Sequence, residues 1–328
     1  MNTTIYGYRS DNIGVLKYTD KLCKNLANQE DISCEEPPKL MYPGMLNQVL
    51  LNGIKLRTIS SDLIHICNQD DLATFLFPKS LDFVVTIHDL FRYTEGDLFL
   101  DGFRGEKIVK NLKRANKVIA ISEFTKGQIL DDTKVSKEDI NVIYQGVDLD
   151  DLYPEEGEIE YEKYILHVGT EINRKNIQGL IDIFCIYKEN NPKAKLIRVG
   201  EPSKKTKKHI EKLDLELGKD VIYEQNISIK RLRALYTKAE KLAFPSHAEG
   251  FGRPIVESLA CETPVIAFDR NPMNEILPKK MLVNPDQKER FAQKLSKNYN
   301  INCRKIASKF NWEKTAEKTY NVYKEAKK

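Results

Sequence analysis

The chain has 328 residues, of which 41% are hydrophobic and 30% are charged, and its formal net charge is +4. This length predicts about two domains, and no apolar run reaches the roughly 18 residues of a transmembrane helix. The six cysteines are scattered without a C-x-x-C pair, which argues against a zinc ribbon and against a disulfide framework. The N-terminal residues lack the basic and apolar regions of a signal peptide, so a cytoplasmic location in a reducing compartment is expected.

The two halves of the chain differ in charge. Residues 1–150 contain 18 Lys and Arg against 22 Asp and Glu, whereas the remaining residues contain 34 against 26. A basic second half favours an anionic ligand such as a nucleotide diphosphate. No basic helix with interleaved aromatic residues stands out, so a nucleic-acid partner is not expected.

Strands and helices alternate in the first half. Short apolar runs rich in β-branched residues predict strands at 3–8, 63–67, 83–87, 117–121 and 141–144. An amphipathic helix follows the first strand. Gly14 lies at its start, where a glycine is either a plain turn or a place at which backbone approaches a ligand. Residues 31–45 contain Pro37-Pro38 and Pro43-Gly44 and are predicted to be a loop.

Two further features of the first half are candidates for function. The strand at 83–87 ends in His88-Asp89, and open α/β sheets bind ligands in loops at the carboxyl ends of their strands. His65 and His167 lie within strands and are interpreted as structural. A basic amphipathic helix is predicted at residues 101–114, for which a solvated face is the simpler interpretation and contact with a membrane surface the alternative.

The second half repeats the alternation, with strands predicted at 164–168, 194–199, 221–223, 241–244 and 264–268. Pro154 and the acidic run at 155–162 predict a linker, which divides the chain into domains 1–153 and 154–311. A final amphipathic helix is predicted at residues 312–328. Alternation in both halves predicts two doubly wound, Rossmann-like α/β domains with the active cleft between them.

Two cations lie where a helix of the second domain begins. The strand at 164–168 leads into Gly169-Thr170, and Arg174-Lys175 come directly before the next helix. Cations at a helix N-terminus oppose the helix dipole. Their presence there indicates a phosphate to neutralise, and two exposed bases on a loop are the alternative interpretation.

The stretch from Ser246 to Glu257 carries the strongest signal in the sequence. An apolar strand runs into Glu249-Gly250-Phe251-Gly252, and Pro254 suits the first turn of a helix. A glycine turn before a helix start presents backbone N–H groups to an anion, most often a phosphate. Glu257, in the first turn, can accept hydrogen bonds from a vicinal diol such as that of a ribose.

These motifs resemble retaining glycosyltransferases of the group 1 family (family 4), which have the GT-B fold. The resemblance implies that the C-terminal helix at 312–328 packs back on the N-terminal domain. Glu249 to Glu257 resembles the family's Glu-x7-Glu signature. The stretches at 86–90 and 169–176 resemble those of a subgroup that includes O-antigen mannosyltransferases. The chain departs from the family pattern at Gln145 (usually Asn), Asn173 (usually Pro), Arg253 (usually small or aliphatic), Ser258 (usually Ala) and Glu262 (usually Gly).

The resemblance implies a role for each motif. Glu249 would contact the donor sugar, the backbone of Gly250, Phe251 and Gly252 would meet sugar and phosphate, and Glu257 would hold the ribose. Arg174 and Lys175 would bind the donor pyrophosphate, and His88 would point at the donor sugar. Gly14, Gly169 and Thr170 would also face the donor. His88, Glu249, Arg174 and Lys175 are therefore the candidate catalytic residues.

The resemblance also implies the reaction. A hexosyl unit, mannosyl in preference to glucosyl, would pass with retention from a nucleotide-diphosphate sugar to a glycan or lipid-linked acceptor. GDP-mannose is favoured over a UDP-sugar as donor. Neither a metal nor another cofactor is expected, because no Asp-x-Asp doublet lies near the site. A lipid-linked acceptor would bring the N-terminal domain into peripheral contact with the cytoplasmic membrane face.

Two alternative functions are compatible with the same motifs. One is a GT-B-type nucleotide-sugar 2-epimerase, which would convert its nucleotide-sugar without an acceptor. The other is a non-catalytic, glycosyltransferase-like binding subunit. Intact His88, Arg174, Lys175, Glu249 and Glu257 argue against the second, because an inactive copy has no reason to keep all five.

Overall fold

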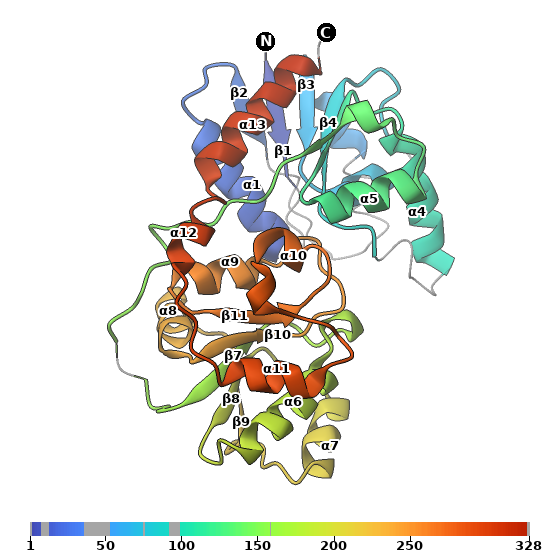
Figure 1. The fold of residues 1–328 in the computed structure, drawn as a ribbon. Helices are drawn as coiled ribbons and strands as arrows, with labels where there is room; N and C mark the ends of the chain where they lie inside the picture. Colours follow the sequence, from blue (N-terminus) through green and yellow to red (C-terminus); the bar gives the residue numbers. More distant parts are fainter. Residues whose placement is uncertain are drawn as a thin grey trace. The chain divides into compact units, whose positions relative to one another are not determined.

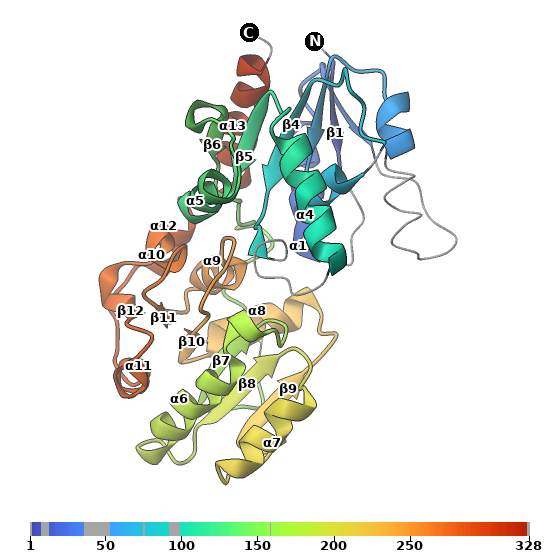
Figure 2. The same cartoon turned by 90° about the vertical axis from the view of Figure 1, so that its right-hand side faces the viewer.

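The computed structural model describes residues 2–7, 13–35, 53–74, 76–91, 99–157 and 159–326 (Figures 1 and 2). The chain forms two compact units. Unit 1 comprises Met1–Gly146 and Trp312–Lys328, and unit 2 comprises Val147–Asn311. Each unit is built on its own parallel sheet of six strands with helices on both faces. The predicted doubly wound α/β class is therefore confirmed.

Unit 1 is built on a sheet with strand order β2-β1-β3-β4-β5-β6, and each neighbouring pair is parallel. Its elements are β1 (Thr3–Tyr6), α1 (Ile13–Leu26), β2 (Ile32–Glu35), β3 (Leu63–Ile66), η1 (Gln69–Ala73), β4 (Phe83–Ile87), α4 (Phe99–Leu112), β5 (Lys117–Ala120), α5 (Glu123–Asp132), η2 (Lys137–Asp139), β6 (Ile140–Val142) and α13 (Trp312–Glu325). Apolar side chains of α1 and α13 pack on one face of this sheet, and those of η1, α4 and α5 pack on the other.

The strand β2 corrects the prediction of a loop at residues 31–45. Ile32–Glu35 pairs in parallel with β1, and its side chains are half-buried or exposed rather than buried. A short edge strand of this kind gives no apolar run for a sequence pattern to detect. Residues 36–45 of the predicted loop lie outside the described residues.

Two cysteines of unit 1 are paired, which the sequence argument did not anticipate. Cys23 in α1 and Cys34 in β2 form a disulfide, whereas Cys67, Cys185, Cys261 and Cys303 are free. Cysteine spacing could not reveal the pair, because the bridge depends on β2 lying beside β1 and under α1. Disulfides are typical of oxidising compartments. Cysteine spacing therefore gives no support for the expected reducing compartment.

The structural division of the chain falls after Gly146, not at residue 153. Val147 donates its backbone N–H to the carbonyl of Phe310 at 2.7 Å and forms a parallel bridge with Asn311. Arg304 donates to the carbonyls of Leu149 and Leu152. The segment before the acidic run thus belongs to unit 2. The final helix α13 belongs to unit 1, where Trp312 packs in the cluster that includes Tyr18.

Unit 2 is built on a sheet with strand order β12-β11-β10-β7-β8-β9. Its elements are β7 (Tyr164–Val168), η3 (Asn173–Lys175), α6 (Ile177–Glu189), β8 (Lys195–Val199), α7 (Lys204–Lys212), β9 (Val221–Glu224), α8 (Ile229–Lys238), β10 (Lys241–Phe244), α9 (Arg253–Ala260), β11 (Val265–Phe268), α10 (Met273–Ile276), η4 (Lys279–Met281), β12 (Leu282–Val283), α11 (Lys288–Leu295) and α12 (Cys303–Ala307). Side chains of α6, α7 and α11 form the core on one face, and α8, α9 and α12 pack together.

The strand order of unit 2 places its functional loops. β7 and β10 are neighbours in the sheet and run in parallel, with Leu166 opposite Leu242. The loops that leave their carboxyl ends therefore begin at the same edge of the sheet. One loop carries Arg174 and Lys175, and the other carries Glu249.

A candidate anion site in unit 2

Three charged residues predicted from the sequence meet in unit 2. Lys175 Nζ lies 2.5 Å from Glu249 Oε1, and Arg174 Nη1 lies 2.8 Å from Glu249 Oε2. Glu249 is 4% exposed and Lys175 8% exposed, whereas a quarter of the Arg174 side chain remains accessible. We refer to these three residues as the Arg-Lys-Glu cluster. Its formal charge is +1, so it presents a positive centre despite its carboxylate.

Backbone contacts fix the two loops against each other. His247 donates its backbone N–H to the carbonyl of Arg174 at 2.8 Å, and Arg174 Nη1 donates to the carbonyl of Ala248 at 3.0 Å. Asn176 Nδ2 donates to the carbonyl of Pro245 at 3.1 Å. Because these hydrogen bonds hold the two loops together, the two cations and the carboxylate of the cluster occupy defined positions.

The glycine turn before α9 has the local geometry that the sequence predicted. Gly252 is the N-cap residue with φ 94°, a left-handed conformation that glycine adopts without strain, and Pro254 lies in the first helical turn. A Cβ at Gly252 would lie 3.1 Å from Ile255 Cδ1. Phe251 is buried, and its ring packs edge-on against Phe310 with centroids 5.6 Å apart. The Phe251 side chain is thus part of the core of unit 2.

Glu257 lies one turn into α9 and is bonded at both oxygens. Its Oε2 accepts a hydrogen bond from the hydroxyl of Tyr236 at 3.0 Å. Its Oε1 lies 3.3 Å from Nη2 of Arg253, four residues earlier on the same helix. The Glu257 side chain is 13% exposed, so its carboxylate retains contact with solvent.

A second buried ion pair supports the loop that carries the two cations. Arg198 in β8 is fully buried, and its Nη1 lies 2.5 Å from Glu171 Oε1 while its Nη2 donates to the carbonyl of Gly169 at 2.8 Å. Glu171 Oε2 accepts from the backbone N–H of Ser203 at 2.8 Å. Burial raises the pKa of Glu171, but hydrogen bonds from Thr206 and Ser203 outweigh burial and hold its pKa below the ordinary value.

Gly169 and Thr170 lie beside this ion pair. Gly169 has φ 150°, and a Cβ there would lie 3.8 Å from Lys175 Cε. Thr170 is exposed. His167, in β7, is fully buried, and burial lowers its pKa well below the ordinary value, with Arg198 and Lys175 adding to the effect. His167 is therefore a neutral core histidine, as the sequence predicted.

The other two predicted site residues belong to unit 1. His88 follows β4, is 7% exposed, and is bonded at both ring nitrogens. Its Nδ1 accepts from Gln145 Nε2 at 2.9 Å, and its Nε2 donates to the carbonyl of Cys67 at 2.9 Å. The ring is therefore a neutral imidazole with its proton on Nε2. Gly14 is the second residue of α1 and is partly buried.

Comparisons with known proteins assign the chain to a family. Residues 150–318 match the family model described as glycosyl transferases group 1, and residues 32–151 match the one described as glycosyltransferase family 4. This chain belongs to the group 1 glycosyltransferase family. The match on residues 150–318 covers both loops of the Arg-Lys-Glu cluster and all of α9. The expected family membership is therefore confirmed.

Curated relatives agree with this assignment. The chain is similar to the O-antigen chain mannosyltransferase RfbU of Salmonella typhimurium, at 32% identity over 62% of this chain and 57% of that protein. It is also similar to the MMP alpha-(1->4)-mannosyltransferase of Mycolicibacterium hassiacum, at 26% identity over 64% of this chain and 54% of that protein. The matches thus span little more than half the length of these relatives.

The fold of the glycosyltransferase chain is GT-B. The structure of Anabaena HepE in complex with UDP and glucose matches with a TM-score of 0.78 at 19% identity, over 99% of both chains. Sucrose-phosphate synthase from Thermosynechococcus elongatus matches with a TM-score of 0.74 at 19% identity, over 99% of this chain and 98% of that one. Identities this low establish the fold alone, and the predicted GT-B fold is confirmed.

Two departures from the family pattern have a structural explanation. Ser258 is fully buried, and its hydroxyl donates to the carbonyl of Thr263 at 3.1 Å, which ties the end of α9 to the following turn. Glu262 has φ 65°, the left-handed conformation in which glycine is the relaxed residue. The backbone at residue 262 thus has the conformation that explains the family's preference for glycine, although this chain has glutamate there.

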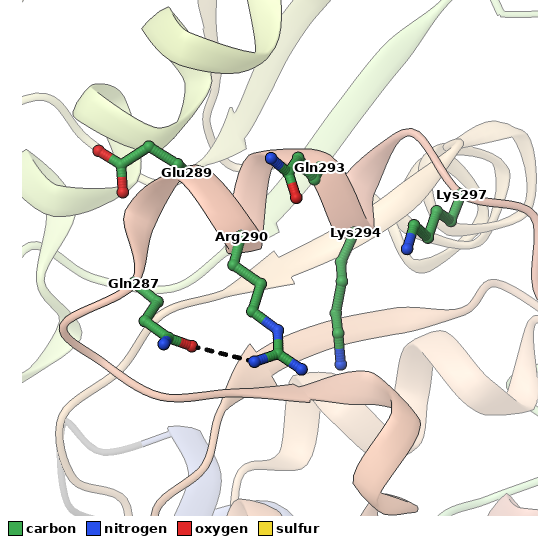
Figure 3. Close-up of a pocket in the computed structure, with 6 residues that line it drawn as sticks. All are labelled: Gln287, Glu289, Arg290, Gln293, Lys294 and Lys297. Carbon is green, nitrogen blue, oxygen red and sulfur yellow. Dashed lines mark hydrogen bonds between the residues drawn. The ribbon is translucent and has the colours of Figure 1, made fainter.

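A pocket of unit 2 lies apart from the predicted donor-site residues. Figure 3 shows a pocket over α11, where Arg290 Nη1 donates to Gln287 Oε1 at 3.3 Å. Its lining residues are Gln287, Glu289, Arg290, Gln293, Lys294 and Lys297. None of the predicted donor-site residues lines it. Among the described residues, no group of three His, Cys, Asp or Glu side chains could hold a metal ion, and no helix could span a membrane.

Proposed function

We propose that the protein is a metal-independent retaining hexosyltransferase that uses a nucleotide-diphosphate sugar. The single observation that carries this proposal is the Arg-Lys-Glu cluster, in which two cations from the β7 loop converge on one carboxylate from the β10 loop. Preorganised cations stabilise charge that develops on a leaving group. In this proposal, Arg174 and Lys175 bind the diphosphate as its bond to the sugar breaks, and Glu249 faces the sugar.

The proposed donor is GDP-mannose, with a UDP-sugar as the second candidate. Two of the relatives named above are mannosyltransferases, which supports a mannosyl donor and favours transfer over epimerisation. Anabaena HepE was solved with UDP and glucose, which keeps a UDP-sugar in consideration. No cofactor is proposed beyond the nucleotide-sugar itself. Glu257 is proposed to bind the ribose of either donor.

The proposed acceptor is a hydroxyl group of a glycan or of a lipid-linked saccharide. The proposed location is the cytoplasm, with peripheral contact at the membrane face. Lys110 in α4 and Lys113 just after it are exposed, and such basic residues attract anionic lipid headgroups. Sedimentation with vesicles containing anionic lipid tests the contact. Binding to neutral vesicles alone would contradict the electrostatic argument.

The reaction is tested with purified full-length protein and a panel of nucleotide-sugars. A donor that binds only the folded state raises the midpoint of thermal unfolding, so a thermal-shift screen identifies the base and the sugar. Incubation of the identified donor with saccharide acceptors should then release the nucleoside diphosphate, and NMR of the product should show the donor's anomeric configuration retained. Conversion of the nucleotide-sugar without acceptor would indicate epimerisation instead.

A further inference from the structure

The carboxylate of Glu257 is held from two sides, by Tyr236 and by Arg253, to which the sequence motifs assigned no role. Tyr236 OH donates to Oε2 at 3.0 Å, and Arg253 Nη2 lies 3.3 Å from Oε1. One donor comes from α8 and the other from the first turn of α9. An ionised carboxylate has about four lone-pair positions. Two donors therefore leave about two positions, which matches the two hydroxyl donors of a vicinal diol.

Tyr236 is fixed independently of Glu257. The residue is fully buried, and its backbone carbonyl accepts from Ala239 N at 3.2 Å and from Thr263 Oγ1. Burial raises the pKa of Tyr236 well above its ordinary value, and the charge of Glu257 raises it further. The phenol therefore remains protonated and acts as a hydrogen-bond donor to the carboxylate.

The helix dipole and the order of the charges along α9 both disfavour an arginine at position 253. A cation in the first turn of a helix opposes the positive end of the helix dipole. Its pairing with Glu257 at i+4 places the cation N-terminal to the anion, which is the less favourable order on a helix surface. The arginine nevertheless lies against Oε1, where it constrains the orientation of the Glu257 carboxylate.

We propose that Tyr236 and Arg253 are positioning residues that hold the Glu257 carboxylate where its remaining lone pairs accept the two ribose hydroxyls of the nucleotide donor. This inference rests on the proposed function and assigns two residues to its ribose subsite. Both residues act through Glu257 and need not touch the donor. A side chain that is already fixed loses less conformational freedom on binding, so the donor binds more tightly.

The test compares two buried tyrosines that each donate one hydrogen bond. Tyr236→Phe removes the donor to Glu257. Tyr164→Phe is the matched control, because Tyr164 is also fully buried and donates to the backbone carbonyl of Leu235 at 2.7 Å. Calorimetry with UDP, GDP and ADP should show an affinity about tenfold weaker for Tyr236→Phe, on the scale of one hydrogen bond to a charged group. Tyr164→Phe should bind as the wild type does.

A nucleotide without the diol shows whether the effect passes through Glu257. The 2′,3′-dideoxy form of the nucleoside diphosphate that binds should have equal affinity for the wild type and for Tyr236→Phe. Arg253→Leu is a second variant at a partly exposed position, and it should show the same pattern. In turnover, both variants should raise the donor KM with little change in kcat, because a ribose contact is made equally in the ground and transition states.

The experiments distinguish failure of the positioning role from failure of the proposed function. Unchanged affinity in both Tyr236→Phe and Arg253→Leu would overturn the positioning role. An equal loss of affinity for the nucleotide with the diol and for the dideoxy form would also overturn it, since the effect would not depend on the diol. If the wild-type protein binds none of the nucleoside diphosphates, the proposed function fails, and the comparison of variants is not needed to show it.

Discussion

Lys175 and Glu249 are 74 positions apart in the chain, and the ammonium of one lies 2.5 Å from Oε1 of the other. The pair is buried, and the Glu249 carboxylate also contacts Arg174. Both oxygens of this carboxylate therefore have a cationic partner. Glu249 thus fixes the positions of the Arg174 and Lys175 cations through these two ion pairs.

We expect Lys175→Met to weaken binding of the nucleoside diphosphate by about 1.5–3 kcal/mol, the contribution of a hydrogen bond to a charged group. Arg174→Gln should act in the same direction. Calorimetry measures both affinities. Lys188→Met is the control, because Lys188 also forms an ion pair in unit 2, with Asp220 at 2.8 Å, but lies outside both loops. Normal affinity in both Lys175→Met and Arg174→Gln would remove these residues from the site.

The sequence predicted much of unit 2 because its signals are local. Strand ends, the glycine turn and Pro254 are each recognisable within a few residues, and the loops after β7 and β10 were both identified as ligand loops. The contact between them could not be read from the sequence. It depends on β7 and β10 being neighbours in the sheet, although β8 and β9 lie between them in the chain.

The features that sequence reasoning missed depend on similar long-range contacts. Nothing in the sequence around Tyr236 shows that its hydroxyl reaches Glu257 from another helix. Nothing around Arg198 shows that its guanidinium pairs with Glu171. The sequence did show Gln145 as a departure from the family pattern. Only the structure shows what that side chain contacts, which is the ring of His88, 57 positions earlier.

The contact between Gln145 and His88 gives a prediction about the tautomer of the histidine. Because Gln145 Nε2 donates to Nδ1, the wild-type ring carries its proton on Nε2. Gln145→Glu replaces the donor with an acceptor and should place a proton on Nδ1. Nitrogen-15 NMR of the imidazole reports the change. His65, whose ring contacts Thr86 and Tyr323 instead, is the internal control and should not change. A wild-type spectrum with the proton on Nδ1 would contradict the assignment.

Buried histidines should make the stability of the protein depend on pH. Burial lowers the pKa of His65 to about 3, and nearby His88 adds to the effect. Below pH 6.5 the unfolded chain takes up a proton that the folded chain binds only near pH 3, so the free energy of unfolding falls as the pH falls through this range. At pH 5 the loss attributable to His65 is about 2 kcal/mol.

Urea unfolding at pH 7.5 and pH 5 measures this loss. The experiment compares the wild type with His65→Gln, because burial also lowers the pKa of His167 in unit 2 and adds its own dependence. The variant should lose less stability than the wild type over the same interval. An identical loss in both proteins would mean that His65 is not the group responsible.

We expect turnover to survive exhaustive chelation. Arg174 and Lys175 already supply two positive charges at the proposed diphosphate site, so a divalent cation is not needed to neutralise the leaving group. Initial rates are compared with and without EDTA. A rate that falls in EDTA and recovers when Mg²⁺ or Mn²⁺ is added back would require a metal in the mechanism.

The two carboxylates of the signature should be separable by kinetics. If Glu257 binds the ribose, its contact is the same in the ground and transition states, so Glu257→Gln should raise the donor KM and weaken binding of the nucleoside diphosphate, with a smaller effect on kcat. Glu249 is different because it faces the sugar in the proposed reaction, where positive charge grows. Glu249→Gln should lower kcat by about 10²-fold, on the scale of one lost electrostatic contact.

The Arg-Lys-Glu cluster adds a second expectation for Glu249→Gln. Removal of its negative charge raises the formal charge of the cluster from +1 to +2 while the amide keeps the size of the side chain. The sugar-free nucleoside diphosphate, which meets the two cations but has no sugar to contact residue 249, should therefore bind as tightly as in the wild type or more tightly. Calorimetry on both variants gives the affinity for the nucleoside diphosphate, and steady-state kinetics gives the donor KM and kcat. Weaker nucleoside diphosphate binding in Glu249→Gln with a normal kcat would exchange the two assignments, because the carboxylate that holds the nucleotide would then be Glu249.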